Sequence, residues 1–262
     1  MTFLKFFQCS LFALIIIVTY TSCSEKESNP QSPADAFAEA REYYDDENFE
    51  LALQKLGQFK SRFPYSKFAV LAELFIANSH FELGNYEEAA IEYKQFVRLH
   101  PKHEKNPFVM FRVGESYWID APEEIDRDQE LTQTAIDEWK NLVRRYPQSQ
   151  YAKRAKIKMK EGNRRIAESH RFVADFYCKM EIYHACAYRF IQLLETYPQY
   201  PDLKKHALLS ASEAFSLLAD IKKEEPQSDK NIFFKSMGEG QLRAKSLKFK
   251  KLAAKIRLPK EK

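Results

Sequence analysis

The sequence predicts an all-α fold, a helical solenoid of about five helix pairs, and three observations support this prediction. Only 6 of the 262 residues are glycine and 45% are hydrophobic, a composition that favours helices over a turn-rich β fold. Small and large apolar residues recur at fixed distances before several prolines. One junction also occurs twice, as "SRFPYSKFAVLA" over residues 61–72 and as "RRYPQSQYAKRA" over residues 144–155.

Residues 1–22 are predicted to be a lipoprotein signal peptide. Lys5 precedes an apolar run that is densest over residues 11–18, and this run is shorter than the roughly 20 apolar residues that span a bilayer. The run ends in "YTS" directly before Cys23, which resembles a lipobox in which the cysteine is lipidated. Ser24 behind it resembles the pattern of lipoproteins sent on to the outer membrane. An ordinary signal peptide with an incidental cysteine is the alternative.

A polar tether is predicted over residues 23–33, followed by repeats over residues 34–228. Aligned on four prolines, the chain has a small residue 12 positions upstream and large apolar residues 8 and 5 positions upstream. Because steps of three and four return to one side of a helix, each set marks a buried helix face, and the proline ends that helix. The sets are Ala52, Leu56 and Phe59 before Pro64; Ala89, Tyr93 and Phe96 before Pro101; Ala135, Trp139 and Leu142 before Pro147; and Cys186, Phe190 and Leu193 before Pro198.

A second helix is predicted upstream of each of these helices, joined to it by a short turn. In the second unit, residues 68–101, the turn is Gly84-Asn85, and residues 47–49 take the same place in the first unit. This arrangement resembles the tetratricopeptide repeat, a helix–turn–helix unit of 34 residues with small residues where its helices cross. The prolines are 37, 46 and 51 residues apart, which indicates insertions in the later repeats.

The third and fifth units have features of their own. The third carries an acidic insert over residues 120–130, in which Asp128 is placed to cap a helix that begins at Gln129. The fifth is predicted to pair helices over about residues 203–218 and 232–256. Residues 229–262 thus form a basic C-terminal helix and tail that close the solenoid with a polar outer face.

Charge is distributed unevenly along the chain. Residues 230–262 contain 11 Lys and Arg against 2 Glu, whereas the rest of the mature chain has 29 basic and 35 acidic residues. A basic tail can bind nucleic acid, but predicted export from the cytoplasm argues against that partner. An acidic protein surface, anionic lipid headgroups and a plain solvated helix face remain open as interpretations.

Cysteines and catalytic motifs add little to this prediction. Cys178 and Cys186 lie eight residues apart; a disulfide is possible, but two small buried residues at a helix contact are the favoured interpretation. The six histidines include no metalloprotease helix motif, and the chain has no P-loop, nucleophile elbow or dinucleotide glycine pattern. The sequence therefore predicts no catalytic residue, no metal site and no cofactor.

The lipobox, the repeats and the acidic insert together resemble the BamD family, the lipoproteins of the outer-membrane β-barrel assembly machine. The resemblance is strongest in "FPYSKFA", in "RYPQSQYA", in "VADFYCKMEIYHACAYRFIQLLETYP" and in the insert residues Asp126, Arg127, Asp128 and Gln129. It implies a non-enzymatic protein that is lipid-anchored at the periplasmic face of the outer membrane. Its implied partners are the periplasmic domains of an Omp85-type barrel subunit, unfolded outer-membrane proteins and other accessory lipoproteins.

The resemblance also implies a division of labour between the repeats. The first two would meet the C-terminal signal of substrate proteins, and the last two would hold the barrel subunit's membrane-proximal periplasmic domain. Aligning the repeats on Gly84 and Ala89 places one set of side chains towards a groove, which would suit a peptide with alternating aromatic residues. The alternative is that these side chains pack against neighbouring helices. The set is Phe37, Arg41, Tyr44, Leu71, Leu74, Asn78 and Phe81.

Two rival functions stay open from the sequence. One is a periplasmic tetratricopeptide lipoprotein that scaffolds peptidoglycan enzymes or proteases. The other is a glycan-processing enzyme with a helical solenoid, which would need a catalytic lobe for which the chain has no spare segment.

Overall fold

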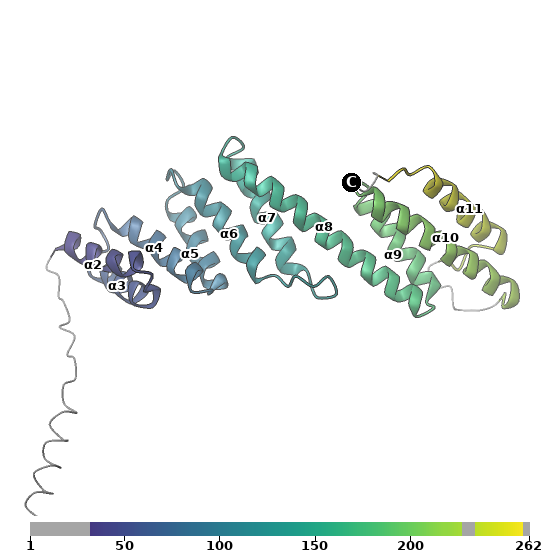
Figure 1. The fold of residues 1–262 in the computed structure, drawn as a ribbon, viewed down its shortest axis with the longest axis horizontal. Helices are drawn as coiled ribbons and strands as arrows, with labels where there is room; N and C mark the ends of the chain where they lie inside the picture. Colours follow the sequence, from purple (N-terminus) through teal and green to yellow (C-terminus); the bar gives the residue numbers. More distant parts are fainter. Residues whose placement is uncertain (1–31, 227–233, 259–262) are drawn as a thin grey trace, which may run out of the picture.

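The computed structural model describes residues 32–226 and 234–258, and this part of the chain is built from ten α-helices without a strand. The predicted all-α solenoid is confirmed (Figure 1). The helices are α2 (Pro33–Asp45), α3 (Phe49–Arg62), α4 (Ala69–Glu82), α5 (Tyr86–Leu99), α6 (Asn106–Asp120), α7 (Glu130–Arg145), α8 (Gln150–Lys179), α9 (Tyr183–Thr196), α10 (Pro201–Glu224) and α11 (Glu239–Ala254). The predicted signal peptide and Cys23 lie outside the described residues.

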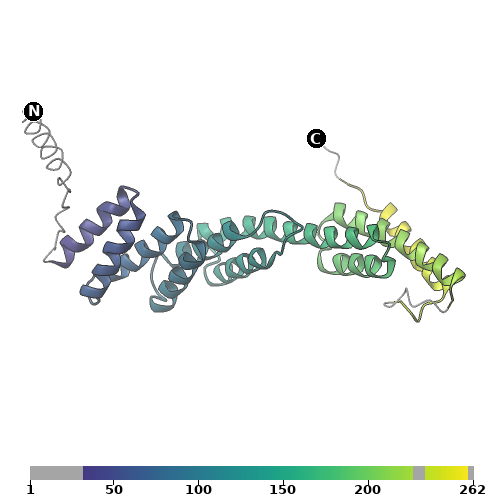
Figure 2. The same ribbon diagram turned by 90° about the horizontal axis from the view of Figure 1, so that it is seen from below.

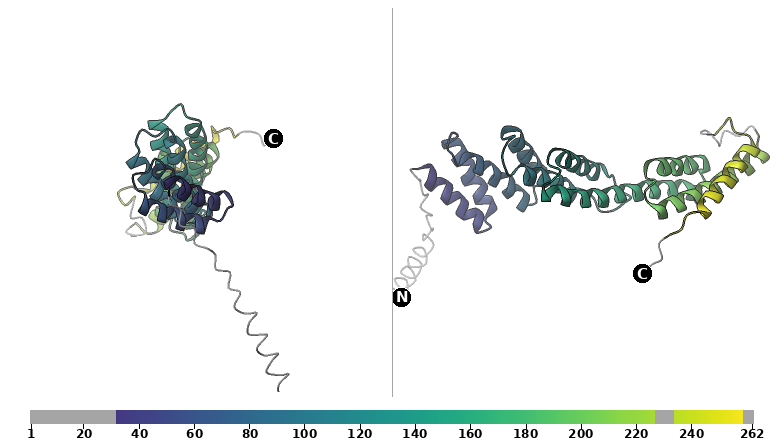
Figure 3. Two further views of the ribbon diagram at one scale, coloured as in Figure 1. Left: turned by 90° about the vertical axis from the view of Figure 1, so that its left-hand side faces the viewer. Right: turned by 90° about the horizontal axis from the view of Figure 1, so that it is seen from above.

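Consecutive helices pack in antiparallel fashion, each against the next, so that α2 lies at one end of the stack and α11 near the other (Figure 1). The first helices of successive units also meet, α2 with α4, α6 with α8, and α8 with α10. The stack is long and gently curved from below and from above, and narrow when viewed from its end (Figure 2, Figure 3). No helix in the described part of the chain has the length and apolar character needed to cross a membrane.

Local sequence signals set several helix boundaries. The side-chain oxygens of Ser32, Asn48 and Ser149 accept hydrogen bonds from backbone N–H groups of α2, α3 and α8, at 3.1, 3.4 and 3.0 Å. The turns after α2 and α4 contain Glu47 (φ 60°) and Gly84 (φ 79°), whose left-handed conformation ends a helix sharply. The structure therefore has turns where the sequence predicts them, at residues 47–49 and at Gly84-Asn85.

The core consists of the residues that recur before the prolines. All twelve are at most 2% exposed, and the four small ones lie where the two helices of a unit cross. Burying a large apolar side chain contributes about 1.5–3 kcal/mol. Hence the repeated pattern marks the positions that hold each helix pair together.

Glycine permits the closest approach in the middle of the stack. The indole of Trp139 is fully buried and its Nε1 donates to the carbonyl oxygen of Phe111 over 3.1 Å. A Cβ atom at Gly114 would overlap that indole, and one at Gly162 would lie 2.9 Å from Cδ1 of Ile136. These two positions have room only for hydrogen, so α6, α7 and α8 pack unusually close.

Two predicted helix starts need correction. Helix α7 begins at Glu130 rather than Gln129, although Asp128 does cap it, because its Oδ1 accepts a hydrogen bond of 2.7 Å from the Glu130 N–H. Helix α11 begins at Glu239 rather than near residue 232. Phe234 lies before that start with its ring 4.9 Å from that of Phe215, and Gly238 precedes the helix as its N-cap.

The two cysteines form a disulfide, which corrects the favoured interpretation of unbonded buried thiols. The S–S distance between Cys178 and Cys186 is 2.01 Å and their Cα atoms are 5.0 Å apart. The turn between α8 and α9 contains Glu181 in a left-handed conformation (φ 59°), which folds the start of α9 back onto the end of α8. Cys186 is also fully buried, so it still fills the small position of the repeat pattern.

Candidate functional site

The seven predicted groove residues lie on α2 and α4 but differ in accessibility. Phe37, Leu74 and Phe81 are buried at 5–8% exposure. Phe37 stacks on Phe68 with ring centroids 5.1 Å apart, and Leu74 and Phe81 belong to the core between α4, α5 and α6. These three side chains hold the helices together and offer little surface. Arg41, Tyr44, Leu71 and Asn78 are exposed or half-buried.

Tyr44 and Asn78 connect the first unit to a polar region of the second. The Tyr44 ring meets Phe75 edge-on at 4.7 Å, and burial followed by the negative charge of Glu82 raises the pKa of its hydroxyl. Asn78 accepts a hydrogen bond of 2.6 Å from the hydroxyl of Tyr93. Burial also raises the pKa of Tyr93, so this hydroxyl is protonated at neutral pH and acts as a donor.

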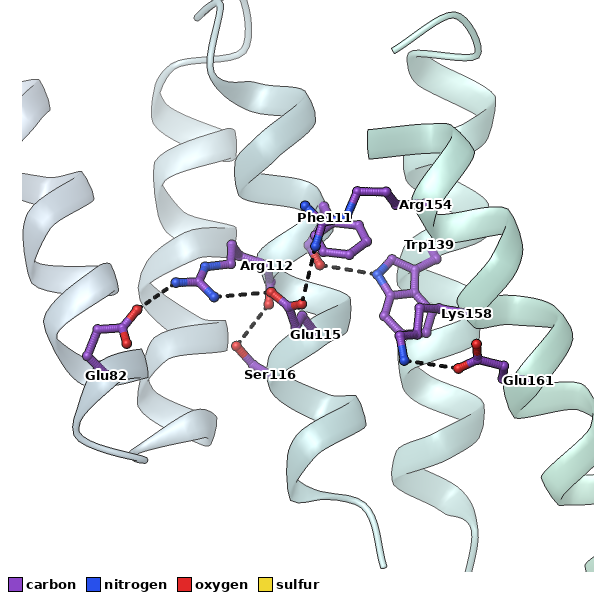
Figure 4. A network of polar contacts seen from close by, with 9 residues as sticks. All are labelled: Glu82, Phe111, Arg112, Glu115, Ser116, Trp139, Arg154, Lys158 and Glu161. Carbon is purple, nitrogen blue, oxygen red and sulfur yellow. Dashed lines mark hydrogen bonds and ion pairs between the residues drawn. The ribbon is translucent and has the colours of Figure 1, made fainter. Parts of the chain in front are cut away.

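Arg112 on α6 is the centre of a charged network that crosses three units. Its guanidinium contacts Glu82 of α4 at 2.7 Å and Glu115 at 3.1 Å (Figure 4). It also lies over the ring of Phe81 at 3.7 Å. On the other side of Glu115, Arg154 of α8 approaches at 3.9 Å. We call Glu82, Arg112, Glu115 and Arg154 the Arg112 network. Burial lowers the pKa of Arg112, but Tyr93, Glu115 and Glu82 outweigh it and raise the pKa overall.

Aromatic rings of α6 and cations of α8 continue this line. Arg154 lies over the ring of Phe111 at 4.3 Å, and Lys158 pairs with Glu161 at 2.9 Å (Figure 4). Lys158 also lies 5.1 Å from the ring centroid of Trp118. Such cation–aromatic contacts each contribute about 0.5–1 kcal/mol at exposed sites. The Arg112 network was not predicted from the sequence. The one indication of it was a single arginine in the largely apolar stretch "FVMFRVGESYW".

The insert residues divide into two pairs. Gln129 donates to the carbonyl oxygens of Glu124 (3.0 Å) and Arg127 (3.2 Å), so together with the capping Asp128 it builds the loop itself. Asp126 and Arg127 are exposed instead. An open depression of about 670 Å³ lies beside them, lined by Asp120, Pro122, Arg127, Asp128, Glu130 and Leu131. The first pair is structural, and the second is available for contact.

An apolar stripe on α8 was not anticipated from the sequence. Phe172, Phe176 and Met180 follow one another at intervals of four residues, so they share one helix face, and they are 41%, 51% and 55% exposed. Ile182 in the following turn is 38% exposed. We call these four residues the α8 stripe. Contiguous exposed apolar side chains of this kind are typical of protein–protein contacts.

The described residues contain no group of three or more His, Cys, Asp or Glu side chains arranged to hold a metal ion. His100 and His103 are next to one another, with ring centroids 6.5 Å apart. The ring of His100 contacts Glu73 at 2.7 Å.

Comparison with known proteins identifies the family. The family model YfiO, described as "Outer membrane lipoprotein", matches residues 29–230. The outer membrane protein assembly factor BamD of Vibrio cholerae is 27% identical over 175 residues, 63% of this chain and 73% of that protein. BamD of Xylella fastidiosa (strain Temecula1) is 27% identical over 169 residues, 61% of this chain and 57% of that protein. BamD of Rickettsia prowazekii is 26% identical, covering 70% and 74%.

Solved structures of tetratricopeptide proteins are also similar to the chain. They include the TPR2AB domain of yeast Sti1 (TM-score 0.44, 12% identity, covering 84% of this chain and 89% of that one). A tetratricopeptide protein of Parabacteroides merdae has a TM-score of 0.39 at 14% identity, covering 88% and 95%. The resemblance to the BamD family predicted from the sequence is confirmed by the family model and the sequence relatives. Since the family model matches well over half of its residues, the chain belongs to the YfiO family of outer membrane lipoproteins.

Proposed function

We propose that this protein is a non-enzymatic scaffold of the machine that assembles β-barrel proteins in the outer membrane. It is anchored by a lipid on Cys23 at the periplasmic face. One part of the stack holds an Omp85-type barrel subunit through its periplasmic domains, and another receives unfolded outer-membrane proteins. The family match over residues 29–230, to relatives named as outer membrane protein assembly factors, carries this proposal.

The substrate site is assigned to the accessible members of the predicted groove set. Arg41 is 57% exposed and, among the described residues, pairs with Asp45 on its own helix, a surface contact that costs little to exchange. It can therefore pair with the terminal carboxylate of a substrate peptide. Tyr44 and Asn78 offer a ring and an amide beside it, while Phe37, Leu74 and Phe81 support them from the core.

The barrel-subunit site is assigned to the last two units. There the α8 stripe presents Phe172, Phe176 and Met180 on one face, and aromatic and methionine side chains are enriched at protein interfaces. Asp126 and Arg127 lie in the third unit and are assigned to the same partner as a polar rim. Other accessory lipoproteins are expected to join this complex.

The proposal is tested by mild-detergent purification of the tagged, lipidated protein from its own membranes. Stoichiometric recovery of an Omp85-type barrel subunit is expected. The double variant Phe172→Ser, Phe176→Ser should reduce that recovery at least tenfold, whereas Tyr65→Ser, at a fully exposed tyrosine between α3 and α4, should not. Recovery of peptidoglycan enzymes or proteases without the barrel subunit would favour the rival scaffold instead.

The substrate site is tested separately with a fluorescent peptide that ends in the alternating aromatics of a barrel strand. Arg41→Ala and Tyr44→Ser are expected to weaken its binding at least fivefold each, measured by anisotropy. Tyr65→Ser again serves as the control. Unchanged affinity in both groove variants, with circular dichroism showing intact helices, would place the substrate elsewhere.

A further inference from the structure

Helix α11 closes the stack and is packed on one side only. Leu242 and Ala253 are fully buried, and Ser246 accepts a hydrogen bond of 2.9 Å from Ser212 of α10 through its carbonyl oxygen. Lys245 is held over the ring of Phe215 at 5.0 Å. This inner face fixes the helix on α10, so the side chains on the opposite face have fixed directions.

The opposite face combines leucines with cations of a single sign. Leu247 is 53% exposed, Leu252 39%, and Leu258, just beyond the helix, 44%. Because five residues turn an α-helix by about 140°, Leu247 and Leu252 lie at the two edges of this face, and exposed cations lie between and beside them: Lys248, Lys250, Lys251, Lys255 and Arg257. We call these eight residues the α11 outer face.

Its five cations are not neutralised by the rest of the described protein. Arg243, at the start of the helix, pairs with Glu239 and with Asp220, each at 2.8 Å. Among residues 32–226 and 234–258, no carboxylate forms an ion pair with any of the other five. The pattern on α11 therefore fits a negatively charged partner.

We propose that the α11 outer face docks on an anionic phospholipid surface. A basic helix with leucines between its lysines binds in the interface of a membrane, where the leucines enter the boundary of the acyl chains. Its lysine side chains extend so that their charges reach the headgroups. The exposed leucines favour a phospholipid surface over an acidic protein as the partner, because binding to an acidic protein would require only the cations.

The position of α11 gives this contact a structural consequence. Helices α2 and α11 lie towards opposite ends of the elongated stack (Figure 1). Together with the proposed lipid near the N-terminus, a second membrane contact at α11 lays the stack along the membrane. Only this orientation rests on the proposed function; the lipid affinity of α11 does not.

The test uses the non-lipidated chain from Ser24 onward, which contains every residue of the described fold, in flotation with vesicles. Vesicles of 30% phosphatidylglycerol in phosphatidylcholine should bind it at least tenfold more strongly than pure phosphatidylcholine. Replacing Lys248, Lys250, Lys251 and Lys255 by Gln should abolish this difference. The matched control replaces four exposed lysines on other elements, Lys102, Lys153, Lys160 and Lys223, by Gln; it removes equal charge and should retain the difference.

A further variant separates insertion from plain charge attraction. Leu247→Ser should weaken vesicle binding about threefold at constant charge and leave helicity unchanged. Equal binding to both kinds of vesicle, or equal losses in the α11 and control variants, would overturn the proposal. So would site-specific cross-linking in cells that attaches residue 251 to an acidic protein and not to lipid. Because no assembly partner is present in the vesicle assay, its failure leaves the proposed function standing.

Discussion

The first three helix pairs, α2 to α7, are built from helices of 13 to 16 residues, whereas the last two pairs contain the longer helices α8 and α10 and a covalent link. In the first part, Arg112 pairs with carboxylates of α4 and α6, and Trp139 fills the contact between α6 and α7. In the last part, the 30-residue helix α8 is joined to α9 by the disulfide, and five cations on and just after α11 form no ion pair with other described residues. Ion pairs between helices occur in both parts, since Arg164 of α8 pairs with Asp202 of α10, whereas the cation-rich outer surface belongs to the second part.

The first prediction breaks the close packing in the middle of the stack. Gly114→Ala should lower the free energy of unfolding by about 3 kcal/mol, because the new Cβ overlaps the buried indole of Trp139. Gly57→Ala is the matched control: nothing lies within 4 Å of its Cβ position, so helix propensity should make it stabilising by about 0.5–1 kcal/mol. Thermal unfolding followed by circular dichroism measures both, and the same sign for the two changes would contradict the packing argument.

The second prediction concerns the covalent link in the last part. Replacing Cys178 by Ser and Cys186 by Ala should cost about 2 kcal/mol, since the bond closes a short loop in the unfolded chain. Addition of a thiol reductant should lower the melting temperature of the native protein towards that of the variant. If reductant lowers both melting temperatures equally, the disulfide is not the cause.

The third prediction concerns the Arg112 network. Arg112→Met should destabilise the protein by about 1–2 kcal/mol, because Glu82 and Glu115 lose their cation while remaining partly buried. Arg154→Met is the control, since Arg154 is 59% exposed and 3.9 Å from Glu115, and it should cost less than about 0.5 kcal/mol. If urea unfolding gives equal losses of stability for Arg112→Met and Arg154→Met, Arg112 is not the residue on which the network depends most.

The smallest effect is a pH dependence in alkaline solution. The pKa of Tyr93 is raised in the folded protein, chiefly by burial, so its stabilising contribution is complete below the unfolded pKa of about 10. The unfolded state loses this proton first as the pH rises, so about 1 kcal/mol of stability should be gone at pH 11. Tyr93→Phe should make the fall of the melting temperature above pH 9 shallower, whereas Tyr65→Phe, at a fully exposed position, should leave it as it is.

The sequence predicted the helix pairs because small residues and prolines recur at spacings that only a helix brings to one face. It did not predict where α11 begins, since the ring of Phe234, which precedes the helix, packs against Phe215 of α10, a contact between residues far apart in the sequence. The sequence did not favour the disulfide over unbonded thiols, because a spacing of eight residues does not show whether the chain turns back between the two cysteines. The left-handed conformation at Glu181 makes that turn.

The candidate site was predictable only in part. Repeat registration places Arg41, Tyr44 and Asn78 on α2 and α4, two helices that contact each other, but which residues remain accessible depends on packing with α3, α5 and α6. The Arg112 network joins residues about 30 to 70 positions apart in the chain and has no local signature. The α8 stripe is visible in the sequence as a spacing of four, yet that spacing could equally have marked a buried face.

The length of α8 has a consequence for the geometry of the whole molecule. An α-helix advances about 1.5 Å and turns about 100° with each residue, so its 30 residues extend for about 45 Å without interruption. A single residue inserted near its middle would rotate every later helix by about a quarter turn relative to the earlier ones. Substitutions of exposed residues there keep this angle, whereas changes in length would alter the angle between whatever the two ends of the molecule hold.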